Sequence, residues 1–373
     1  MLFRLLTVLV VFFSVVVTGV RAQPVEPLAI VSIWVSAMDF SSDSKNLALS
    51  VGRWEDVGFL PLRYEVWNKD SGRRLQSFSN QMEQNPRVLF SPDGTKLIGY
   101  GLRVREGKEP EVRATVWQID SGEKLFDLPV EEPQGYFTHM AFSPDGTSIV
   151  GIHQLQREGK RETSVYVWDA NTGASQQRWH DSSYHPVAAH YIDNNQKLLL
   201  AGWNATPGGS HTSLQELDLR QGKITRTHAI GKYAIARSVM GDGGNPLALY
   251  WVNIGEQAGT AAGLEVLQWQ SPQTPLSLTM SRITPLSLHF NSEGNELHGV
   301  ALSLEQDRKF QLCRWDTQTG DSLGIVTLDR LPDDTPYSSI IDSKAEIAAI
   351  AIGPTVKLHR TSDGELLQTL QVD

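Results

Sequence analysis

Short apolar runs separated by turn residues recur along most of the chain, and one stretch shows the unit clearly. Residues 88–90 form an apolar run, 91–94 read Ser-Pro-Asp-Gly, and 96–100 form a second run. In such a turn proline presets φ, aspartate caps with its side chain and glycine adopts the left-handed conformation. Further runs follow at 112–117 and 124–128. The pattern predicts four antiparallel strands joined mainly by tight turns.

This unit repeats, because a tryptophan followed five residues later by glycine returns at intervals of about fifty residues. The tryptophans are Trp67, Trp117, Trp168, Trp269 and Trp315. Thr274 replaces the glycine after Trp269, and Leu217 with Gly222 and His359 with Gly364 occupy the two remaining positions. The sequence therefore predicts seven repeated units, whose tryptophans belong to the scaffold.

The motifs resemble those of the WD-repeat β-propeller family. They are Phe142-Ser143-Pro144-Asp145-Gly146, Val167-Trp168-Asp169 and Thr172-Gly173, with matching copies in other units. The resemblance implies an all-β fold, a seven-bladed propeller of four-stranded antiparallel blades around a central channel. Only residues 168–169 and 315–316 keep the Trp-Asp dipeptide, and the usual opening Gly-His is absent. The sequence is therefore more similar to divergent, exported, bacterial propellers of this type.

Residues 23–373 are predicted to form this single domain. The expected blades span approximately 36–80, 86–130, 138–181, 188–229, 236–280, 286–329 and 338–371. Two segments, 28–34 and 366–371, could each supply the outermost strand of the seventh blade. We expect 366–371 to complete that blade, with 28–34 beside it or at the entrance to the first; the alternative is an N-terminal strand that latches the ring.

Residues 1–22 are predicted to be a secretory signal peptide. Arg4 supplies positive charge, positions 5–20 are almost wholly apolar, and Ala22 ends a candidate cleavage site. An uncleaved membrane anchor is the alternative, although the apolar run is short for a membrane span. We therefore expect export to the periplasm or the extracellular space, with no membrane attachment after cleavage.

The net charge disfavours one class of partner, and the cysteine content excludes one kind of stabilising bond. Loss of Arg4 and Arg21 with the signal peptide would change the net charge from −9 to −11, so nucleic-acid binding is disfavoured. Cys313 is the only cysteine, which excludes an intrachain disulfide, and its place in a predicted strand favours a buried structural role.

The predicted meander places its tight turns at one end of the ring and its longer connections at the other. The longer connections are 51–62, 101–111, 153–162, 203–212 and 254–263. Binding residues concentrate on such loops over a rigid scaffold. The mixed charges of 103–111 and 156–162 suggest solvated hairpin tips that resist edge pairing, with a charge-steered partner contact as the alternative.

Aromatic residues at this end are the candidate binding residues. Trp54 and Phe59 lie together in the first long connection, either facing a partner or folded over the neighbouring blade. Another aromatic residue precedes the first strand of five blades, where it could line the channel mouth or pack between blades. These residues are Trp34, Tyr136, Tyr184, Tyr233 and Tyr337.

No motif for catalysis, a cofactor or a metal stands out. The sequence has no Gly-x-Ser-x-Gly elbow, no phosphate-binding glycine loop and no His-Glu-x-x-His. His180, His185 and His190 form the densest histidine group but lack the spacing typical of a metal site. We expect no cofactor and no metal.

The sequence favours a non-catalytic binding scaffold for another protein or an extracellular ligand, which would use the end with the long connections. The alternative is a propeller enzyme of the lactonase, lyase or cyclotransferase type with its site at the channel mouth. Convergent charged residues in the channel would favour the enzyme.

Overall fold

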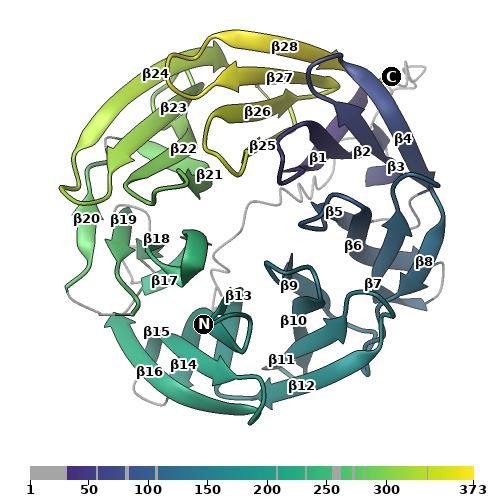
Figure 1. Ribbon diagram of the computed structural model, residues 1–373, viewed down its shortest axis with the longest axis vertical. Helices are drawn as coiled ribbons and strands as arrows, with labels where there is room; N and C mark the ends of the chain where they lie inside the picture. Colours follow the sequence, from purple (N-terminus) through teal and green to yellow (C-terminus); the bar gives the residue numbers. More distant parts are fainter. Residues whose placement is uncertain are drawn as a thin grey trace, which may run out of the picture.

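The computed structural model describes residues 32–373 apart from 56–57, 80–83, 106–107, 207–208, 232, 254–261, 271–273, 281 and 334. Its strands form seven four-stranded antiparallel sheets arranged as blades around a central axis (Figure 1). Within the described ranges the sole helix is one short 3₁₀ turn, Asp242–Gly244. The predicted all-β, seven-bladed propeller is confirmed.

Each blade is built from four consecutive strands. Blades 1 and 2 contain β1 (Ser32–Phe40), β2 (Asn46–Glu55), β3 (Gly58–Asn68), β4 (Arg73–Ser79), β5 (Gln84–Phe90), β6 (Lys96–Arg105), β7 (Lys108–Gln118) and β8 (Lys124–Asp127). Blades 3 and 4 contain β9 (Tyr136–Phe142), β10 (Ser148–Arg157), β11 (Lys160–Asp169), β12 (Ser175–Asp181), β13 (Tyr184–Ile192), β14 (Lys197–Thr206), β15 (Gly209–Asp218) and β16 (Lys223–Gly231).

The remaining three blades follow the same order. Blade 5 contains β17 (Tyr233–Met240), β18 (Leu247–Asn253), β19 (Ala262–Leu267) and β20 (Leu276–Leu278). Blade 6 contains β21 (Ile283–Phe290), β22 (Glu296–Ser303), β23 (Lys309–Asp316) and β24 (Ser322–Arg330). Blade 7 contains β25 (Tyr337–Ile341), β26 (Ile347–Ile352), β27 (Thr355–Arg360) and β28 (Leu366–Gln371).

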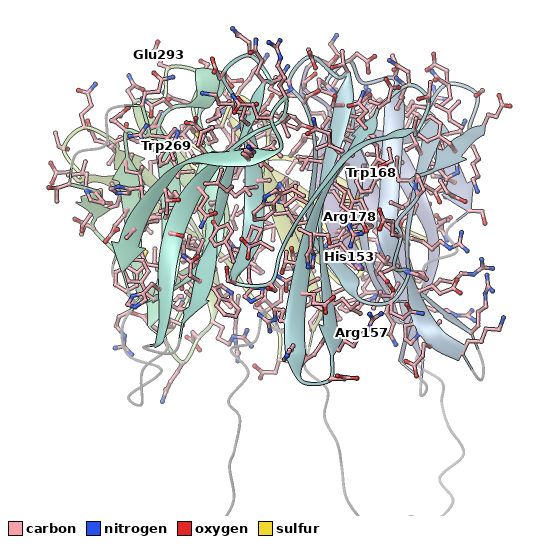
Figure 2. All side chains as sticks on the ribbon, turned by 90° about the horizontal axis from the view of Figure 1, so that it is seen from below. His153, Arg157, Trp168, Arg178, Trp269 and Glu293 are labelled. Carbon is pink, nitrogen blue, oxygen red and sulfur yellow. The ribbon has the colours of Figure 1, made fainter. Side chains whose placement is uncertain are left out.

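The first strand of every blade lines the channel and the fourth forms the outer rim (Figure 1). The two ends of the ring differ. Glu293, in the turn between β21 and β22, lies at one end, whereas Arg157, at the tip of β10, lies toward the other (Figure 2). We call these the turn end and the hairpin end.

The repeated tryptophan and glycine hold neighbouring blades together. The Trp168 indole donates to the carbonyl of Pro129 at 2.8 Å, and the Trp315 indole donates to Thr279 O at 2.7 Å. Each acceptor lies in the segment that leaves the preceding blade. Gly173 has φ 72°, and a Cβ there would lie 2.5 Å from Phe126 of blade 2. The predicted scaffold role of the tryptophans is confirmed, since all five are buried.

The Ser-Pro-Asp-Gly turn has the expected chemistry. In blade 2 the Asp93 carboxylate accepts from the Thr95 backbone N–H at 3.0 Å and from the Ser91 hydroxyl. Gly94 follows with φ 70°, a conformation that side chains disfavour. These local hydrogen bonds replace those that the strands cannot make where the chain reverses.

The ring closes by side-chain packing between blades 1 and 7. β28 pairs with β27 and completes blade 7, as predicted, while β1 belongs to blade 1. Residues 28–31 lie outside the described residues. One apolar cluster joins Val35, Leu49 and Val51 of blade 1 to Val356 and Leu370 of blade 7. The closing junction thus depends on burial of apolar surface rather than on a shared strand.

Polar contacts reinforce this junction. The Val35 N–H donates to Gly353 O at 3.1 Å, and the Ser338 hydroxyl donates to Val35 O at 3.0 Å. Near the outer rim, Arg74 lies 2.7 Å from the buried Glu65 carboxylate and 3.4 Å from the Asp373 carboxylate. A buried charge needs such a partner. Arg74 therefore connects blade 1 to the end of the chain.

The described helical content includes no segment that is long and apolar enough to cross a membrane.

We expect Leu370→Ala to lower the free energy of unfolding by about 2–5 kcal/mol, because it leaves a cavity in the closing junction. Leu367→Ala is the matched control, since Leu367 is 43% exposed on the same strand whereas Leu370 is 1% exposed. It should change stability by less than about 0.5 kcal/mol. Urea denaturation followed by tryptophan fluorescence measures both. Equal effects of the two changes would contradict closure by apolar packing.

Candidate functional site

Two-stranded tips project from blades 2, 3 and 4 at the hairpin end. In blade 3 the neighbouring strands stop at Tyr136, opposite Gln154, and at Asp181, opposite Thr163. The β10–β11 ladder continues beyond them to the pair formed by Arg157 and Lys160. Blades 2 and 4 have the same arrangement.

Blade 7 has no such tip, because its neighbouring strands reach the ends of β26 and β27 (Tyr337 opposite Ile352, Gln371 opposite Thr355). The prediction of long loops is therefore wrong for most of these segments in blades 1 to 4. Their backbones continue the antiparallel ladder, which satisfies their hydrogen bonds until a short turn. At the tip of blade 3, Glu158 and Gly159 both have positive φ, as in a type I′ hairpin turn.

The predicted aromatic residues lie at or near the start of the inner strands, at the hairpin end, but their environments differ. Tyr136 is 43% exposed, and its hydroxyl donates to the Gln154 side chain at 3.2 Å. Tyr184 is fully buried, with its hydroxyl 2.9 Å from Leu200 O and 3.0 Å from Ser213 O. The stacking role considered for Tyr184 is therefore wrong. Its ring packs between blades 3 and 4, edge to face against Trp179 of blade 3.

The other three residues of this set are partly buried. The Tyr233 ring stacks on Trp251 with centroids 4.4 Å apart, and its hydroxyl lies 3.3 Å from the Glu265 carboxylate. Burial and the nearby Glu265 charge raise the pKa of Tyr233. Tyr337 packs edge to face against Phe310 at 5.7 Å, and Trp34 lies in β1 opposite Gly52. The five residues therefore do not form one continuous aromatic surface.

Trp54 and Phe59 are strand residues rather than loop residues. They face each other across the β2–β3 ladder. Direct cross-strand partners share one face of a hairpin. The orientation of their side chains lies outside the described part of the structure.

A group that the sequence did not reveal joins blades 3 and 4 at the hairpin end. The Trp203 ring lies between His185, at 4.4 Å between ring centroids, and the Arg161 guanidinium, at 5.2 Å. Gln154, which accepts from Tyr136, donates to Pro186 O at 3.2 Å. We call this group the blade 3–4 rim; it consists of Tyr136, Gln154, Arg161, His185 and Trp203.

The blade 3–4 rim combines chemistry suited to recognition. Trp203 is only partly buried and Tyr136 is exposed, so both rings present surface. Stacking of a guanidinium on an indole orders both side chains. Gly208 follows Trp203 at the spacing of the repeat, but Trp203 is out of register with the interval of about fifty residues that relates the scaffold tryptophans. This register is the sign in the sequence that its role differs.

The inner strands are linked by side-chain hydrogen bonds around the channel. His139 of blade 3 bonds to Ala189 O of blade 4 at 2.9 Å, and His190 of blade 4 bonds to the Ser238 hydroxyl of blade 5 at 2.8 Å. Burial lowers the pKa of His139 to about 4 and that of His190 to about 3. Both imidazoles are therefore neutral at pH 7.

Asp39 makes the equivalent link between blades 1 and 2. Its carboxylate accepts from the Phe90 N–H at 2.7 Å. Burial raises the pKa of Asp39 to about 7, against the hydrogen bond that favours its charged form. Asp39, His139 and His190 each bond to a neighbouring blade, and their burial at these contacts shifts their pKa values.

The three histidines considered as a metal group are held apart by separate contacts. His180 bonds to Ser164, His185 to Thr163 and His190 to Ser238. Among the described residues, no group of three or more His, Cys, Asp or Glu side chains could hold a metal ion. Cys313 is buried, as predicted, and burial raises the pKa of its thiol to about 12.

Tyr184→Phe should lower the free energy of unfolding by about 1–2 kcal/mol, because the buried carbonyls of Leu200 and Ser213 lose a hydroxyl donor. Tyr136→Phe, at the equivalent place in blade 3, removes from an exposed ring a hydroxyl with one acceptor, Gln154 at 3.2 Å, and should lower the free energy of unfolding by less than Tyr184→Phe does. Chemical denaturation of the two variants compares them directly. A larger loss for Tyr136→Phe would contradict the assignment of Tyr184 to the scaffold.

Asp39→Asn should stabilise the fold by about 1–3 kcal/mol at pH 8 and have little effect at pH 4. The folded pKa of about 7 exceeds the ordinary 3.8, so the folded state prefers the protonated carboxyl. This contribution to stability is complete below pH 3.8 and is lost as the pH rises through 7. Asparagine resembles the protonated form and removes the loss. Unfolding measured from pH 4 to 8 gives the difference.

Asp145→Asn is the control, because this substitution is expected to change stability in the opposite direction from Asp39→Asn. Hydrogen bonds from Ser143 and Thr147 outweigh the effect of burial and lower the pKa of Asp145 to about 2. The Asp145 carboxylate therefore stabilises the fold above pH 3.8, and this stabilisation is lost as the pH falls toward 2. The variant should be less stable than the wild type at neutral pH. An Asp39→Asn effect independent of pH would contradict the raised pKa.

Comparisons with known proteins extend the description of the fold. No family model matches the chain. Aspartate 1-decarboxylase from Methylobacterium nodulans is 26% identical over 92 residues, which are 22% of this chain and 60% of that protein. The chain thus matches less than two thirds of the length of this curated relative.

A chain of hydrazine synthase from Kuenenia stuttgartiensis is similar in structure, with a TM-score of 0.64 and 12% sequence identity. The similarity covers 92% of this chain and 99% of that chain. At this identity the likeness concerns the fold alone. The protein is a seven-bladed β-propeller with a solved structural neighbour of the same architecture.

Proposed function

We propose that this protein is a non-catalytic binding scaffold that engages another protein, or an extracellular ligand, through the hairpin end of the propeller. The observation that carries the proposal is the group of projecting tips on blades 2, 3 and 4, beside the blade 3–4 rim. Exposed segments on a rigid scaffold are the usual location of binding residues.

The composition of the tips supports this proposal. Arg157 lies 3.1 Å from Glu132, and Arg161 stacks on Trp203, so the tip of blade 3 is held against its surroundings at two points. Aromatic residues and arginine supply most of the binding energy at protein interfaces. A preordered surface also loses less conformational entropy on binding.

The turn end offers fewer candidate binding residues. Its turns are short and use their polar side chains internally, as Asp93 does with Ser91 and Thr95. In blade 3, Asp169 accepts from the backbone N–H groups of Asn171 and Thr172 at 2.9 and 2.8 Å. These contacts stabilise the turns and leave fewer groups for a partner.

The competing proposal is a propeller enzyme with its site in the channel. Titratable residues on the inner strands favour it, since perturbed pKa values cluster at active sites. However, Asp39, His139 and His190 each hold a neighbouring blade, which gives their burial a structural explanation. Because these contacts account for the three residues without catalysis, we propose the scaffold and keep the enzyme as the alternative.

Two further parts of the proposal come from the sequence. The motifs of blades 2 and 3 support a divergent member of the WD-repeat-like propellers, and residues 1–22 support export by a signal peptide. The partner would then be met in the periplasm or outside the cell.

Site-specific photocrosslinking in the producing cells tests the binding face. A crosslinking amino acid is placed at Gln156, exposed at the tip of blade 3, or at Glu293, exposed at the turn end. We expect one discrete crosslinked species from Gln156 and none from Glu293. Mass spectrometry of the species identifies the partner.

In a second comparison, Trp203→Ala is introduced into the protein that carries the crosslinking amino acid at Gln156. If Trp203 contributes to the face, this change should reduce the yield of the Gln156 crosslink by about tenfold, the effect of losing one strong contact. Crosslinks that form only from Glu293, or equally from both positions, would contradict binding at the hairpin end.

A further inference from the structure

Two arginines occupy equivalent positions on inner strands of different blades. Arg87 lies three residues before Phe90, the last residue of β5, and Arg237 lies three residues before Met240, the last residue of β17. Arg87 is paired with Tyr100 of the next strand, and Arg237 with Tyr250. The same arginine-tyrosine pair therefore occurs at one height in blades 2 and 5.

These blades lie across the channel from each other (Figure 1). Blades 3 and 4 separate them on one side of the ring, and blades 6, 7 and 1 on the other. Both arginine side chains are exposed, although their strands are the innermost of the fold. Solvent in the channel therefore reaches both guanidinium groups.

The two positive charges lie at one height on inner strands that face each other across the channel (Figure 1), an arrangement that lets them interact. Although Arg237 reaches solvent, the surrounding inner strands partly dehydrate it, which lowers its pKa, and the charge of Arg87 lowers the pKa further. Two like charges in a confined, partly dehydrated space repel each other more strongly than they would in water. An anion bound between the two arginines would relieve this repulsion.

No carboxylate in the described part of the chain forms an ion pair with either arginine. Asp39 is the nearby acidic residue, since its charge raises the pKa of Tyr100, which also interacts with Arg87. Asp39 accepts from the Phe90 N–H instead, and it is partly protonated at neutral pH because its pKa is about 7. It therefore compensates the arginines poorly.

The surroundings of Arg237 suit an oxygen-rich ligand. Its Nε donates to Pro285 O at 3.2 Å, which holds the guanidinium between blades 5 and 6 through one of its nitrogens. Tyr250 and Tyr337 are close enough for their charged forms to affect the pKa of Arg237. Arginine binds carboxylate and phosphate groups by paired, charge-assisted hydrogen bonds.

We propose that Arg87 and Arg237 form an anion-binding site in the central channel, which takes a small organic molecule carrying two carboxylate or phosphate groups. One acidic group would contact each arginine, so that the ligand bridges blades 2 and 5. The site lies inside the ring and is separate from the face proposed to bind a partner. It adds a small-molecule ligand to the proposed function.

Isothermal titration calorimetry at constant ionic strength tests the site with succinate, citrate, inorganic phosphate and acetate. Succinate or citrate should bind saturably and more tightly than acetate, because two acidic groups can engage both arginines. Arg87→Gln and Arg237→Gln should each weaken this binding by at least about tenfold. Arg73→Gln removes the same charge from the exposed outer strand β4 and should leave binding unchanged.

A second measurement separates loss of the site from loss of the fold. Without a binding anion, Arg87→Gln and Arg237→Gln should unfold at the same temperature as the wild type or above it, because each removes the repulsion. Their melting temperatures should respond less than that of the wild type to added citrate. The proposal is overturned if no probe binds saturably, or if Arg73→Gln weakens binding as much as either channel variant.

Discussion

The packing of the first blade against the seventh is the contact on which the whole ring depends. Six of the seven junctions join blades that follow each other along the chain, but the last must join segments about three hundred residues apart, as between Ser338 and Val35. Closing so long a loop costs conformational entropy. Burial of Val35, Val51, Val356 and Leu370 in one cluster offsets that cost. If this junction opened, the apolar faces of both blades would meet water.

The other junctions are also held by apolar packing between adjacent blades, and three layers of contacts can be distinguished in them. Apolar side chains fill the middle of each junction, a tryptophan indole bonds to the segment leaving the preceding blade in blades 3 and 6, and polar side chains connect several inner strands. The inner layer explains why Asp39, His139 and His190 are dehydrated without requiring catalysis. Arg87 and Arg237 fit this pattern only in part: Arg237 bonds to Pro285 O of blade 6, but no carboxylate among the described residues forms an ion pair with either arginine.

Much of the scaffold was predictable from the sequence, since the turn motifs and the repeated tryptophan act locally. The strands of the hairpin tips were harder to predict from the sequence, because residues 103–111 are charged and lack the apolar alternation that marks a strand. Their strand structure comes from continuation of the backbone ladder, which needs no particular side chains. Tyr136 and Tyr184 occupy similar places in the sequence, yet one is exposed and the other buried. The local packing that separates them involves residues such as Ser213, distant in the chain.

The candidate sites show a similar limit. Trp203 is set apart by its contacts with Arg161 and His185, which come from different strands of the fold. Arg87 and Arg237 both precede the end of an inner strand by three residues, so the repeat could have revealed their equivalence. Their position across a common channel depends on the closure of the ring. Local sequence motifs do not show that the two arginines lie on opposite sides of the same channel.

The projecting tips on blades 2, 3 and 4 also break the approximate sevenfold symmetry of the propeller. A ring with seven equal tips would offer seven similar docking positions, and several copies of a partner could compete for them. Among the described residues, blades 2, 3 and 4 carry such tips and blade 7 does not, while the connection of blade 5, 254–261, lies outside them. A partner that binds these three tips, as proposed, would sit to one side of the propeller axis.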